Sequence, residues 1–440
     1  MKIYAYTEIS FKVGRRTISG HTHAGVEDRT WDKVDDELER GRRERFQGQA
    51  ANRETRHHVG KVVAIADISH SRRVKQVVVD LMGRAIRYQA GDRCAILPEN
   101  SEQLIERTLQ TIRARGDEAI RLDATWQAAL LERTGQPALS TITLRDLLTY
   151  GHLRPVKQST LYHLYRQTQS LHLKALIDAP SAGATELWEL LAIVGEEGYD
   201  LRTLWQAPAA GQQSPPVSSL LCQLIPPQEF RMYSISSAMT AAERAGMGAS
   251  QLALTVEQLQ YPRVPRLGVV VAESDTPTAV TCYGTASNFL TTTVGKPFTL
   301  KIVHPPRFHL PQDQTRPIVM FAGGTGISPF RSFLQERVQS VNSGENWLFW
   351  GLRTADDFCY QEEFERLVAG QQLQLRVAFS QQAVALDGAT PFTFRVGQPQ
   401  RITDAMRDPE TRDRLWSLLR CVEEGGEGAY IYICGRADFA

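Results

Sequence analysis

GGTGISPFR, at residues 323–331, is the stretch that decides the fold of the C-terminal part of this chain. It follows an apolar run at residues 318–322 and precedes residues 333–337, which favour a helix. Strand, glycine turn and helix together form a diphosphate site, because glycines let the backbone approach phosphate and the helix N-terminus offers free N–H groups. We therefore expect Gly324, Thr325 and Gly326 to contact a phosphate-bearing cofactor. A tight turn without a ligand is the alternative interpretation.

Strands and helices alternate around this turn. The pattern predicts strands at residues 318–322, 347–351, 373–379 and 430–434, and helices at residues 328–340, 360–369 and 411–423. Such alternation is typical of a parallel sheet covered on both faces, which binds its ligand at the carboxyl ends of the strands. Arg353, Ser380 and Cys434 follow or end three of these strands, so we expect them near that edge. A solvated arginine and a small buried cysteine are the alternatives.

The preceding residues, 56–312, predict an antiparallel β-barrel. Runs rich in valine and isoleucine occur at residues 59–66, 74–81, 94–98, 231–235, 252–259 and 267–271, separated by polar turns. Helical segments interrupt them at residues 102–115, 125–134, 143–150, 159–169, 171–177 and 185–194, with Ser101 and Thr143 as expected N-caps. We thus expect a helical insertion at about residues 100–210, after which the barrel resumes near Leu220.

One barrel strand carries three side chains that suit a flavin site. Such a site must hold a diphosphate, present an aromatic surface and place a hydrogen-bond donor near the reactive ring nitrogen. Arg231, Tyr233 two positions later on the same strand face, and the adjacent Ser234 supply these groups. An ordinary strand with an exposed arginine and tyrosine is the alternative.

A second candidate phosphate site lies at Gly284, Thr285, Ala286 and Ser287. These residues precede a short helical segment, with Ser287 expected near its N-cap. Free N–H groups at that end would suit a diphosphate. A plain capped helix is the alternative.

Composition excludes several classes of protein. The chain has 440 residues, 42% of them hydrophobic, with a formal net charge of +1, which fits two or three globular domains and gives no bulk attraction to nucleic acid or membranes. Its six cysteines lack CxxC spacing, which argues against zinc or iron–sulfur sites and a disulfide scaffold. No apolar run approaches the ~20 residues of a membrane span, and no signal peptide is evident. A reducing cytoplasm is the expected compartment.

Residues 1–55 differ from the rest. They predict a short strand pair followed by a solvated, charge-rich helix at residues 32–45. His21 and His23 are interpreted as part of a polar loop, since no further ligand lies at useful spacing. We interpret the segment as an extension or as the remnant of a preceding domain.

From about residue 59 to the end, these segments together resemble the FAD- and NADP-binding part of the diflavin reductase family. That family includes the NADPH–hemoprotein reductases, the sulfite reductase flavoprotein and the nitric oxide synthase reductase half. RMYSISS at residues 231–237 is similar to its RxYSI-[AS]-S strand, and GTASNFL at residues 284–290 to its G-x-[AS]-[ST]-x-x-L loop. Residues 322–335 are similar to its GPGTGIAPFR-x-F-x-Q stretch. The resemblance implies a ferredoxin-reductase-type FAD barrel, an inserted helical connecting domain and a Rossmann-like NAD(P)-binding domain over residues 313–440.

The resemblance also implies roles for individual residues. Arg231 would bind the FAD diphosphate, Tyr233 would pack on the flavin, and Ser234 would donate a hydrogen bond near its reactive nitrogen. Cys434 would lie beside the nicotinamide, which makes Ser234 and Cys434 the candidate catalytic residues. The other implied cofactor contacts are Thr255, Val256, Tyr261, Gly284, Thr285, Ala286 and Ser287 for FAD, and Gly324, Thr325, Gly326, Arg353 and Ser380 for NADP.

Several departures from the family pattern bear on function. Ser380 is followed by Gln381 and Gln382 where the family has residues that hold the 2′-phosphate, so NADH is an alternative to NADPH. The family continues beyond the position of Ala440 through a helix, a strand, an acidic residue and an aromatic residue, so we expect a C-terminally truncated nucleotide domain. We expect no flavodoxin-like FMN domain before residue 59, because the first 55 residues are too short to form one.

The implied function is a flavoprotein oxidoreductase that passes hydride from NADPH to FAD and electrons to an FMN- or heme-containing protein. One alternative is a ferredoxin- or flavodoxin-type NADP reductase without an FMN partner, which the helical insertion argues against. Another is a truncated, redox-silent nucleotide-binding remnant.

Overall fold

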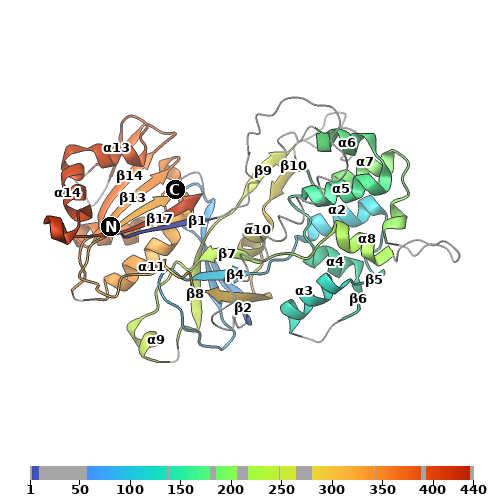
Figure 1. Cartoon of the computed structure of the whole chain (residues 1–440), viewed down its shortest axis with the longest axis horizontal. Coiled ribbons are helices and arrows are strands. Elements are labelled where there is room, and N and C mark those ends of the chain that lie inside the picture. Colours follow the sequence, from blue (N-terminus) through green and yellow to red (C-terminus); the bar gives the residue numbers. More distant parts are fainter. Residues whose placement is uncertain are drawn as a thin grey trace.

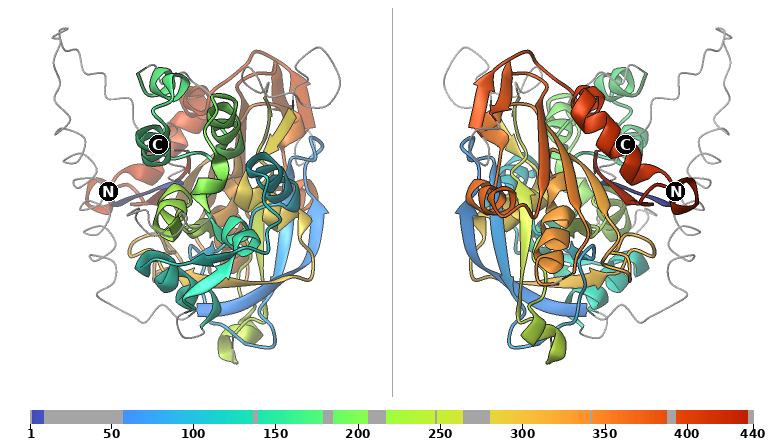
Figure 2. Two further views of the ribbon diagram at one scale, coloured as in Figure 1. Left: turned by 90° about the vertical axis from the view of Figure 1, so that its right-hand side faces the viewer. Right: turned by 90° about the vertical axis from the view of Figure 1, so that its left-hand side faces the viewer.

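The computed structural model describes residues 2–8, 57–135, 139–178, 185–205, 217–246, 248–263, 280–340, 342–387 and 393–436. Figure 1 shows three parts in a row: an α/β domain, a central β-barrel and a cluster of helices. In the side views of Figure 2, the helical cluster faces the viewer on the left and the sheet of the α/β domain on the right. The two therefore lie on opposite sides of the barrel.

The predicted antiparallel barrel is confirmed. Its strands are β2 (His57–Asp67), β3 (Val74–Asp80), β4 (Arg93–Ile96), β7 (Arg231–Ser234), β8 (Gln251–Glu257) and β11 (Pro297–Val303), in the order β7-β4-β11-β2-β3-β8. A bridge between Ile235 and Leu254 brings the two outer strands together. Side chains such as Val62, Val77 and Leu254, all 0% exposed, fill the interior. The strand β11 was not predicted from the sequence, and the strand predicted at residues 267–271 lies outside the described residues.

The helical insertion is also confirmed, with one correction to its end. It contains α2 (Glu102–Ile112), α3 (Ala124–Thr134), α4 (Leu144–Tyr150), α5 (Gln158–Thr168), α6 (Leu171–Asp178), α7 (Leu187–Glu196) and α8 (Val217–Leu224), with a small hairpin of β5 (Ala119–Arg121) and β6 (Thr141–Thr143). Because α8 is helical, the prediction that the barrel resumes near Leu220 is wrong, and the next barrel strand begins at Arg231. Thr143 caps α4 by accepting a 3.0 Å bond from the amide of Asp146, whereas Ser101 makes no side-chain capping bond.

A separate hairpin leaves the barrel towards the helices. It is formed by β9 (Gln260–Arg263) and β10 (Val280–Tyr283), and the helix α10 (Thr285–Thr292) follows it directly. Figure 1 shows the hairpin between the barrel and the helices α5, α6 and α7. This hairpin was not predicted from the sequence.

The α/β domain has the predicted parallel sheet. Its strands β12 (Ile318–Gly323), β13 (Asn346–Leu352), β14 (Gln374–Phe379) and β17 (Tyr430–Arg436) are joined by parallel pairs. The helices α11 (Ser328–Arg337) and α12 (Gln361–Ala369) bury Phe330 and Phe364 against one face of the sheet. On the other face, α14 (Pro409–Leu419) buries Leu415 and Leu418, and α13 (Ile402–Arg407) packs beside it. The sheet is thus covered on both faces, as such alternation requires.

Two further strand pairings belong to this domain. The strand β1 (Lys2–Glu8) lies parallel to β17, from Lys2 opposite Tyr430 to Glu8 opposite Arg436, and so forms one edge of the sheet. After β14, the strands β15 (Val384–Asp387) and β16 (Thr393–Val396) form an antiparallel hairpin. Neither strand pairing was predicted from the sequence.

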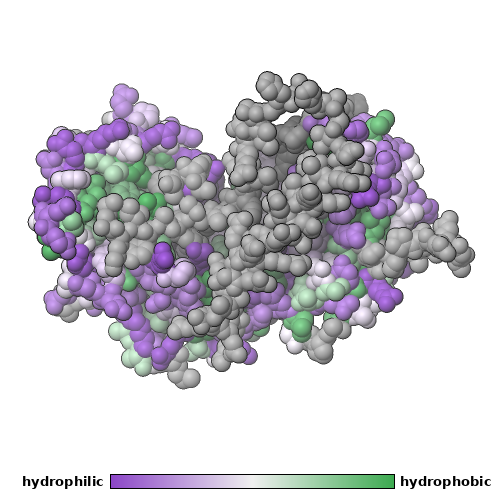
Figure 3. All heavy atoms as spheres, viewed as in Figure 1, coloured by the Kyte–Doolittle hydropathy of each residue, from purple (hydrophilic) through white to green (hydrophobic). Residues whose placement is uncertain are grey.

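The described helices are neither long nor apolar enough to cross a bilayer. On the face shown in Figure 3, hydrophilic residues cover most of the described surface of the α/β domain and of the helical insertion. Within the described ranges, no group of histidine, cysteine, aspartate and glutamate side chains has the arrangement of a metal site. His21 and His23 lie outside those ranges.

Candidate cofactor site

The strand that carries RMYS and the glycine turn meet at one hydrogen bond. Ser234 is the last residue of β7 and is 6% exposed. Its backbone carbonyl accepts a 2.8 Å bond from the hydroxyl of Ser328, the first residue of α11. The 3₁₀ helix η2 (Gly324–Ile327) immediately precedes Ser328. The barrel and the α/β domain therefore bring together the two sequence segments that were predicted to bind cofactors.

The glycine turn packs against the end of β17. A Cβ atom at Gly326 would lie 2.2 Å from the carbonyl oxygen of Cys434, which excludes any larger residue without movement. Gly324 has a φ of +54°, a conformation that glycine adopts without cost, and its carbonyl accepts a 2.9 Å bond from Trp350 Nε1. The turn thus approaches β17 closely, and Thr325 lies within it.

The carboxyl edge of the sheet gathers the other predicted dinucleotide contacts. Cys434 is 2% exposed and pairs with Ala322 at the end of β12. Arg353 follows β13 and is exposed, and Ser380 follows β14. Both the amide and the hydroxyl of Ser380 donate to the carbonyl of Leu352, at 2.9 and 3.2 Å. These side chains therefore occupy neighbouring strand ends, as the sequence pattern predicted.

The two glutamines after Ser380 are held to the adjacent strand end. The amide of Gln381 donates a 2.9 Å bond to the carbonyl of Arg353. The side-chain oxygen of Gln382 accepts a 2.8 Å bond from the amide of Ala355, at the start of the 3₁₀ helix η3 (Ala355–Asp357). A neutral amide side chain therefore caps this turn.

The second candidate phosphate site begins one turn of helix earlier than predicted. Gly284 is the N-cap of α10, so the prediction of Ser287 near the N-cap is corrected. The hydroxyl of Ser287 donates to the carbonyl of Gly284 at 3.3 Å and accepts from the amide of Leu259 at 3.1 Å. The free N–H groups of the first turn accordingly belong to Thr285, Ala286 and Ser287.

One buried hydroxyl at this helix start fits a missing phosphate oxygen. Thr285 Oγ1 is buried and has no hydrogen-bond partner in the part of the chain that the structure describes. Buried hydroxyls in proteins nearly always have a partner. A cofactor oxygen would supply one, and the N–H groups at the start of α10 would bind the same diphosphate. The residues present therefore fit FAD.

Positive charge lies near Arg231 on the side of the barrel that faces the insertion. The Arg231 guanidinium donates to the carbonyl of Glu229 at 3.3 Å, and Lys157 forms a 2.8 Å ion pair with the Glu229 carboxylate. Burial, together with Lys157 and Arg231, lowers the pKa of His152 to about 4, so this histidine is neutral at pH 7. The arginine is therefore the residue best suited to a diphosphate here.

The remaining predicted FAD contacts lie in different surroundings. Tyr233 is half-buried at the margin of the barrel core. Thr255 is 5% exposed and its hydroxyl shares a 2.7 Å bond with the hydroxyl of Tyr360. Val256 is 0% exposed and faces the barrel interior. Tyr261 donates a 3.3 Å bond from its hydroxyl to Glu186 of the insertion.

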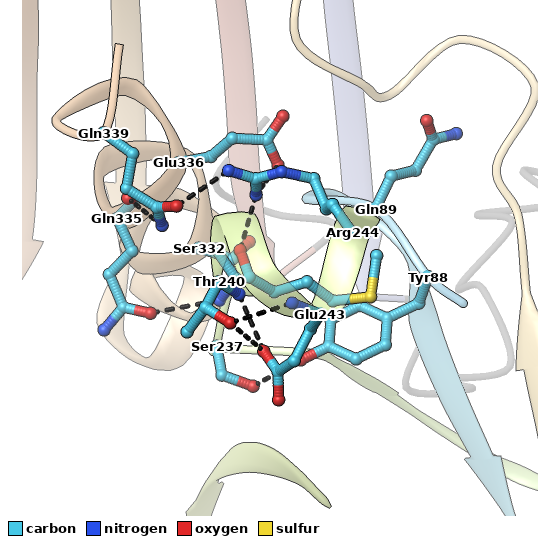
Figure 4. Close-up of polar contacts among 12 residues, drawn as sticks. Tyr88, Gln89, Ser237, Thr240, Glu243, Arg244, Ser332, Gln335, Glu336 and Gln339 are labelled. Atoms are coloured by element: carbon cyan, nitrogen blue, oxygen red, sulfur yellow. Dashed lines mark hydrogen bonds and ion pairs between the residues drawn. The ribbon is translucent and has the colours of Figure 1, made fainter. Parts of the chain in front are cut away.

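The polar side chains that connect α11 to the segment after β7 were not predicted from the sequence. Gln335 Oε1 accepts a 3.0 Å bond from the amide of Ala238, and Arg331 donates a 3.0 Å bond to the carbonyl of Ser236. Figure 4 shows Gln335 of α11, and Gln339 just beyond the end of that helix, near the segment that follows β7. In that segment Arg244, on the short helix α9 (Ala241–Ala245), donates a 2.7 Å bond to Gln339. The sequence did contain an indication, because Arg331 and Gln335 are polar residues four positions apart on a helix that also carries apolar residues.

Two family models match the chain in the order of its domains. A model described as "FAD binding domain" matches residues 50–245, and one described as "Oxidoreductase NAD-binding domain" matches residues 320–440. The first covers the barrel strands β2 to β7 with the helical insertion. The second covers most of the α/β domain.

Curated relatives align with most of the chain. It is 30% identical over 375 residues to the sulfite reductase [NADPH] flavoprotein alpha-component of Aliivibrio fischeri, covering 83% of this chain and 50% of that protein. The corresponding protein of Vibrio cholerae is 28% identical over 373 residues, with 83% and 49% covered. The NADPH–cytochrome P450 reductase of Homo sapiens is 26% identical over 382 residues, with 83% and 50% covered. The chain spans about half the length of these curated relatives.

Proposed function

We infer that this chain, which belongs to the diflavin reductase family through its FAD-binding and NAD-binding domains, moves electrons from a nicotinamide dinucleotide to a protein acceptor. The observation that carries the proposal is the 2.8 Å bond from Ser328 to the carbonyl of Ser234, which joins the two candidate cofactor sites. A bound FAD supplies the chemistry, because a flavin accepts two electrons as hydride and gives them up singly. The chain itself binds, orients and shields the two cofactors.

The barrel residues have the FAD-binding roles in this proposal. Arg231 and the first turn of α10 hold the diphosphate, where the buried Thr285 hydroxyl, unpartnered among the described residues, would gain a hydrogen bond. Tyr233 packs on the flavin, and Ser234 donates a hydrogen bond beside its reactive nitrogen. Thr255 lies on β8, near the end of β7. Val256 stabilises β8 from the barrel core, and Tyr261 lies on the hairpin strand β9.

The α/β domain binds the nicotinamide dinucleotide in this proposal. Gly324, Thr325 and Gly326 hold its diphosphate, and Arg353 and Ser380 lie at the strand ends beside its ribose. Cys434, at the end of β17, lies beside the nicotinamide. NADPH is the proposed donor because the aligned relatives carry that cofactor in their names. NADH remains the competing donor because Gln381 and Gln382 are uncharged.

The proposed acceptor is a flavodoxin-like FMN protein or domain, or a heme protein. The relatives are named as a sulfite reductase flavoprotein and a cytochrome P450 reductase, which supports a one-electron protein acceptor. A cytoplasmic location belongs to the same proposal, supported by six cysteines whose spacing does not suggest a disulfide scaffold.

The acceptor can be tested with purified FAD-loaded protein and excess NADPH. We would compare the rates at which a flavodoxin, a heme protein and a ferredoxin are reduced. Faster reduction of the flavodoxin or the heme protein supports the proposal. Reduction of the ferredoxin alone would favour a ferredoxin-type reductase, and reduction of none of them would contradict electron transfer to such partners.

A further inference from the structure

Tyr360 connects the α/β domain to the barrel strand beside Ser234. It is the N-cap of α12, is 8% exposed, and has a left-handed backbone with φ of +58°. Burial raises the pKa of its hydroxyl to about 12, so the hydroxyl keeps its proton at neutral pH. An L-residue rarely adopts this backbone conformation, so the surrounding contacts must hold it in place.

The hydroxyl of Tyr360 reaches across the domain junction. It shares a 2.7 Å bond with the hydroxyl of Thr255, a buried residue of β8. On the same strand, the carbonyl of Ala253 accepts a 2.8 Å bond from the amide of Ser236, which follows β7. A displacement of Thr255 would therefore also displace the end of β7, which carries Ser234, through the bond between Ala253 and Ser236.

Arg331 packs against the face of the Tyr360 ring. Its guanidinium carbon lies 4.3 Å from the ring centroid, and its Nε donates a 2.8 Å bond to Glu363. The same guanidinium donates a 3.0 Å bond to the carbonyl of Ser236. Together with the bond from Ser328 to Ser234, these contacts place α11 and α12 on two adjacent barrel strands.

The segment around Tyr360 has a second set of contacts that do not involve its hydroxyl. The Tyr360 amide donates to the carbonyl of Ile68 at 3.3 Å, and the Ser71 amide donates to the carbonyl of Asp356 at 2.9 Å. Arg73 forms a 2.9 Å ion pair with Asp357. Removing the hydroxyl therefore leaves the segment attached to the turn between β2 and β3.

We propose that Tyr360 is a positioning residue that sets the flavin strand relative to the glycine turn through its hydroxyl bond to Thr255. The proposal rests on the proposed function, since it concerns how two cofactors are aligned. Reaction between bound groups requires the reacting atoms to be held about 3–3.5 Å apart, and misplacement by about 1 Å is costly. The bond between the hydroxyls of Tyr360 and Thr255 can be removed by deleting one oxygen atom, as in Tyr360→Phe.

The test compares the wild type with Tyr360→Phe, Thr255→Val and the double variant. Under anaerobic conditions, the limiting rate of FAD reduction by saturating NADPH should fall at least tenfold in each single variant, with FAD content and nucleotide affinity preserved. The double variant should be no slower than the single variants, because both remove one interaction. Thr255→Ser keeps the hydroxyl and should retain the wild-type rate. Tyr199→Phe loses a 3.1 Å bond from Thr203 within the insertion and should also leave the rate unchanged.

A second readout does not depend on activity. In FAD-loaded protein without nucleotide, hydrogen–deuterium exchange should increase in β8 and at the start of α12 in Tyr360→Phe, and not in Tyr199→Phe. Unchanged exchange and an unchanged reduction rate in Tyr360→Phe would overturn the proposal, as would additive losses in the double variant. If the wild type itself is not reduced, the proposed function fails and this proposal fails with it.

Discussion

Ser328 Oγ lies 2.8 Å from the backbone carbonyl of Ser234 and donates a hydrogen bond to it. The two residues are 94 positions apart in the chain, one at the end of a barrel strand and one at the start of the helix after the glycine turn. Both are almost fully buried, at 6% and 4% exposure. A cofactor on the barrel strand and a cofactor on the turn would therefore meet at this junction.

The hydroxyl of Ser234 should affect flavin reduction without affecting FAD binding. Ser234→Ala removes a hydrogen-bond donor, and the loss of one such bond corresponds to about 1 kcal/mol or more, so we expect flavin reduction about tenfold slower. Stopped-flow absorbance after mixing with NADPH measures this rate. Ser417→Ala, on the remote helix α14, serves as the control. Wild-type kinetics in Ser234→Ala would remove the residue from the proposed site.

Arg231 should determine FAD affinity. Charge-assisted bonds to phosphate contribute about 1.5–3 kcal/mol, so Arg231→Gln should weaken FAD binding about 10- to 100-fold. Arg231→Lys keeps the charge and should lose less. Fluorescence titration of the apoprotein with FAD measures both affinities. Equal FAD affinity in Arg231→Gln and the wild type would show that the diphosphate lies elsewhere.

Gly326 should be required for nucleotide binding. In Gly326→Ala the added Cβ would lie 2.2 Å from the carbonyl oxygen of Cys434, so the turn must move away from β17. We expect weaker binding of NADP by isothermal titration, with FAD content unchanged. Gly370→Ala is the matched control, since its nearest atom is the carbonyl oxygen of Arg366 at 3.2 Å. Full nucleotide affinity in Gly326→Ala would argue against the turn as the diphosphate site.

The sequence predicted local structure well because local structure follows from periodicity. The runs at residues 318–322 and 347–351 alternate with amphipathic helices, and these elements formed as expected. Pairing between distant segments was not predictable in the same way. The strand β1 finds its partner at Tyr430–Arg436 through an open sheet edge, which no local pattern in residues 2–8 reveals.

The positions of candidate site residues in the fold were predictable where the residue type favours one local structure, as glycine favours a tight turn. The glycine turn and Ser380 follow the strands β12 and β14, as expected, with β13 between those two strands, and their contacts with a cofactor stay predictions. Thr255 and Val256 were both predicted as FAD contacts, yet neighbouring strand residues face opposite sides, and Val256 lies in the barrel core. Residues 357–363 resemble the family, but the contact of Tyr360 was not predictable, because it joins Tyr360 to Thr255, which is 105 positions away in the chain.

A buried carboxylate holds the linker between β11 and β12. Asp92 is 0% exposed and accepts a 2.7 Å bond from His304 Nδ1 and a 2.9 Å bond from His309 Nε2. Burial alone would raise the pKa of Asp92, but the bonds from both histidines and from the amide of Gln89 outweigh burial and lower the pKa below its ordinary value of 3.8. The carboxylate is therefore ionised in the folded protein at neutral pH.

This depressed pKa predicts the sign of an acid effect on stability. Asp92 binds a proton more readily in the unfolded chain, so its contribution to the free energy of unfolding is complete above pH 3.8 and is lost as the pH falls through the lower folded-state pKa. Asp92→Asn should lower the free energy of unfolding at pH 7 by about 1–3 kcal/mol. Urea denaturation at a series of pH values should show this difference shrinking below pH 3.8. A difference that grows as the pH falls would contradict this account.

The most direct test of the central claim is an anaerobic visible spectrum of the FAD-loaded protein before and after addition of NADPH and, separately, NADH. We expect at least one of the two nucleotides to bleach the flavin absorbance, and the faster donor identifies the preferred one. Flavin that binds and stays oxidised with both nucleotides would contradict the claim that the junction at Ser234 and Ser328 brings the two cofactors together.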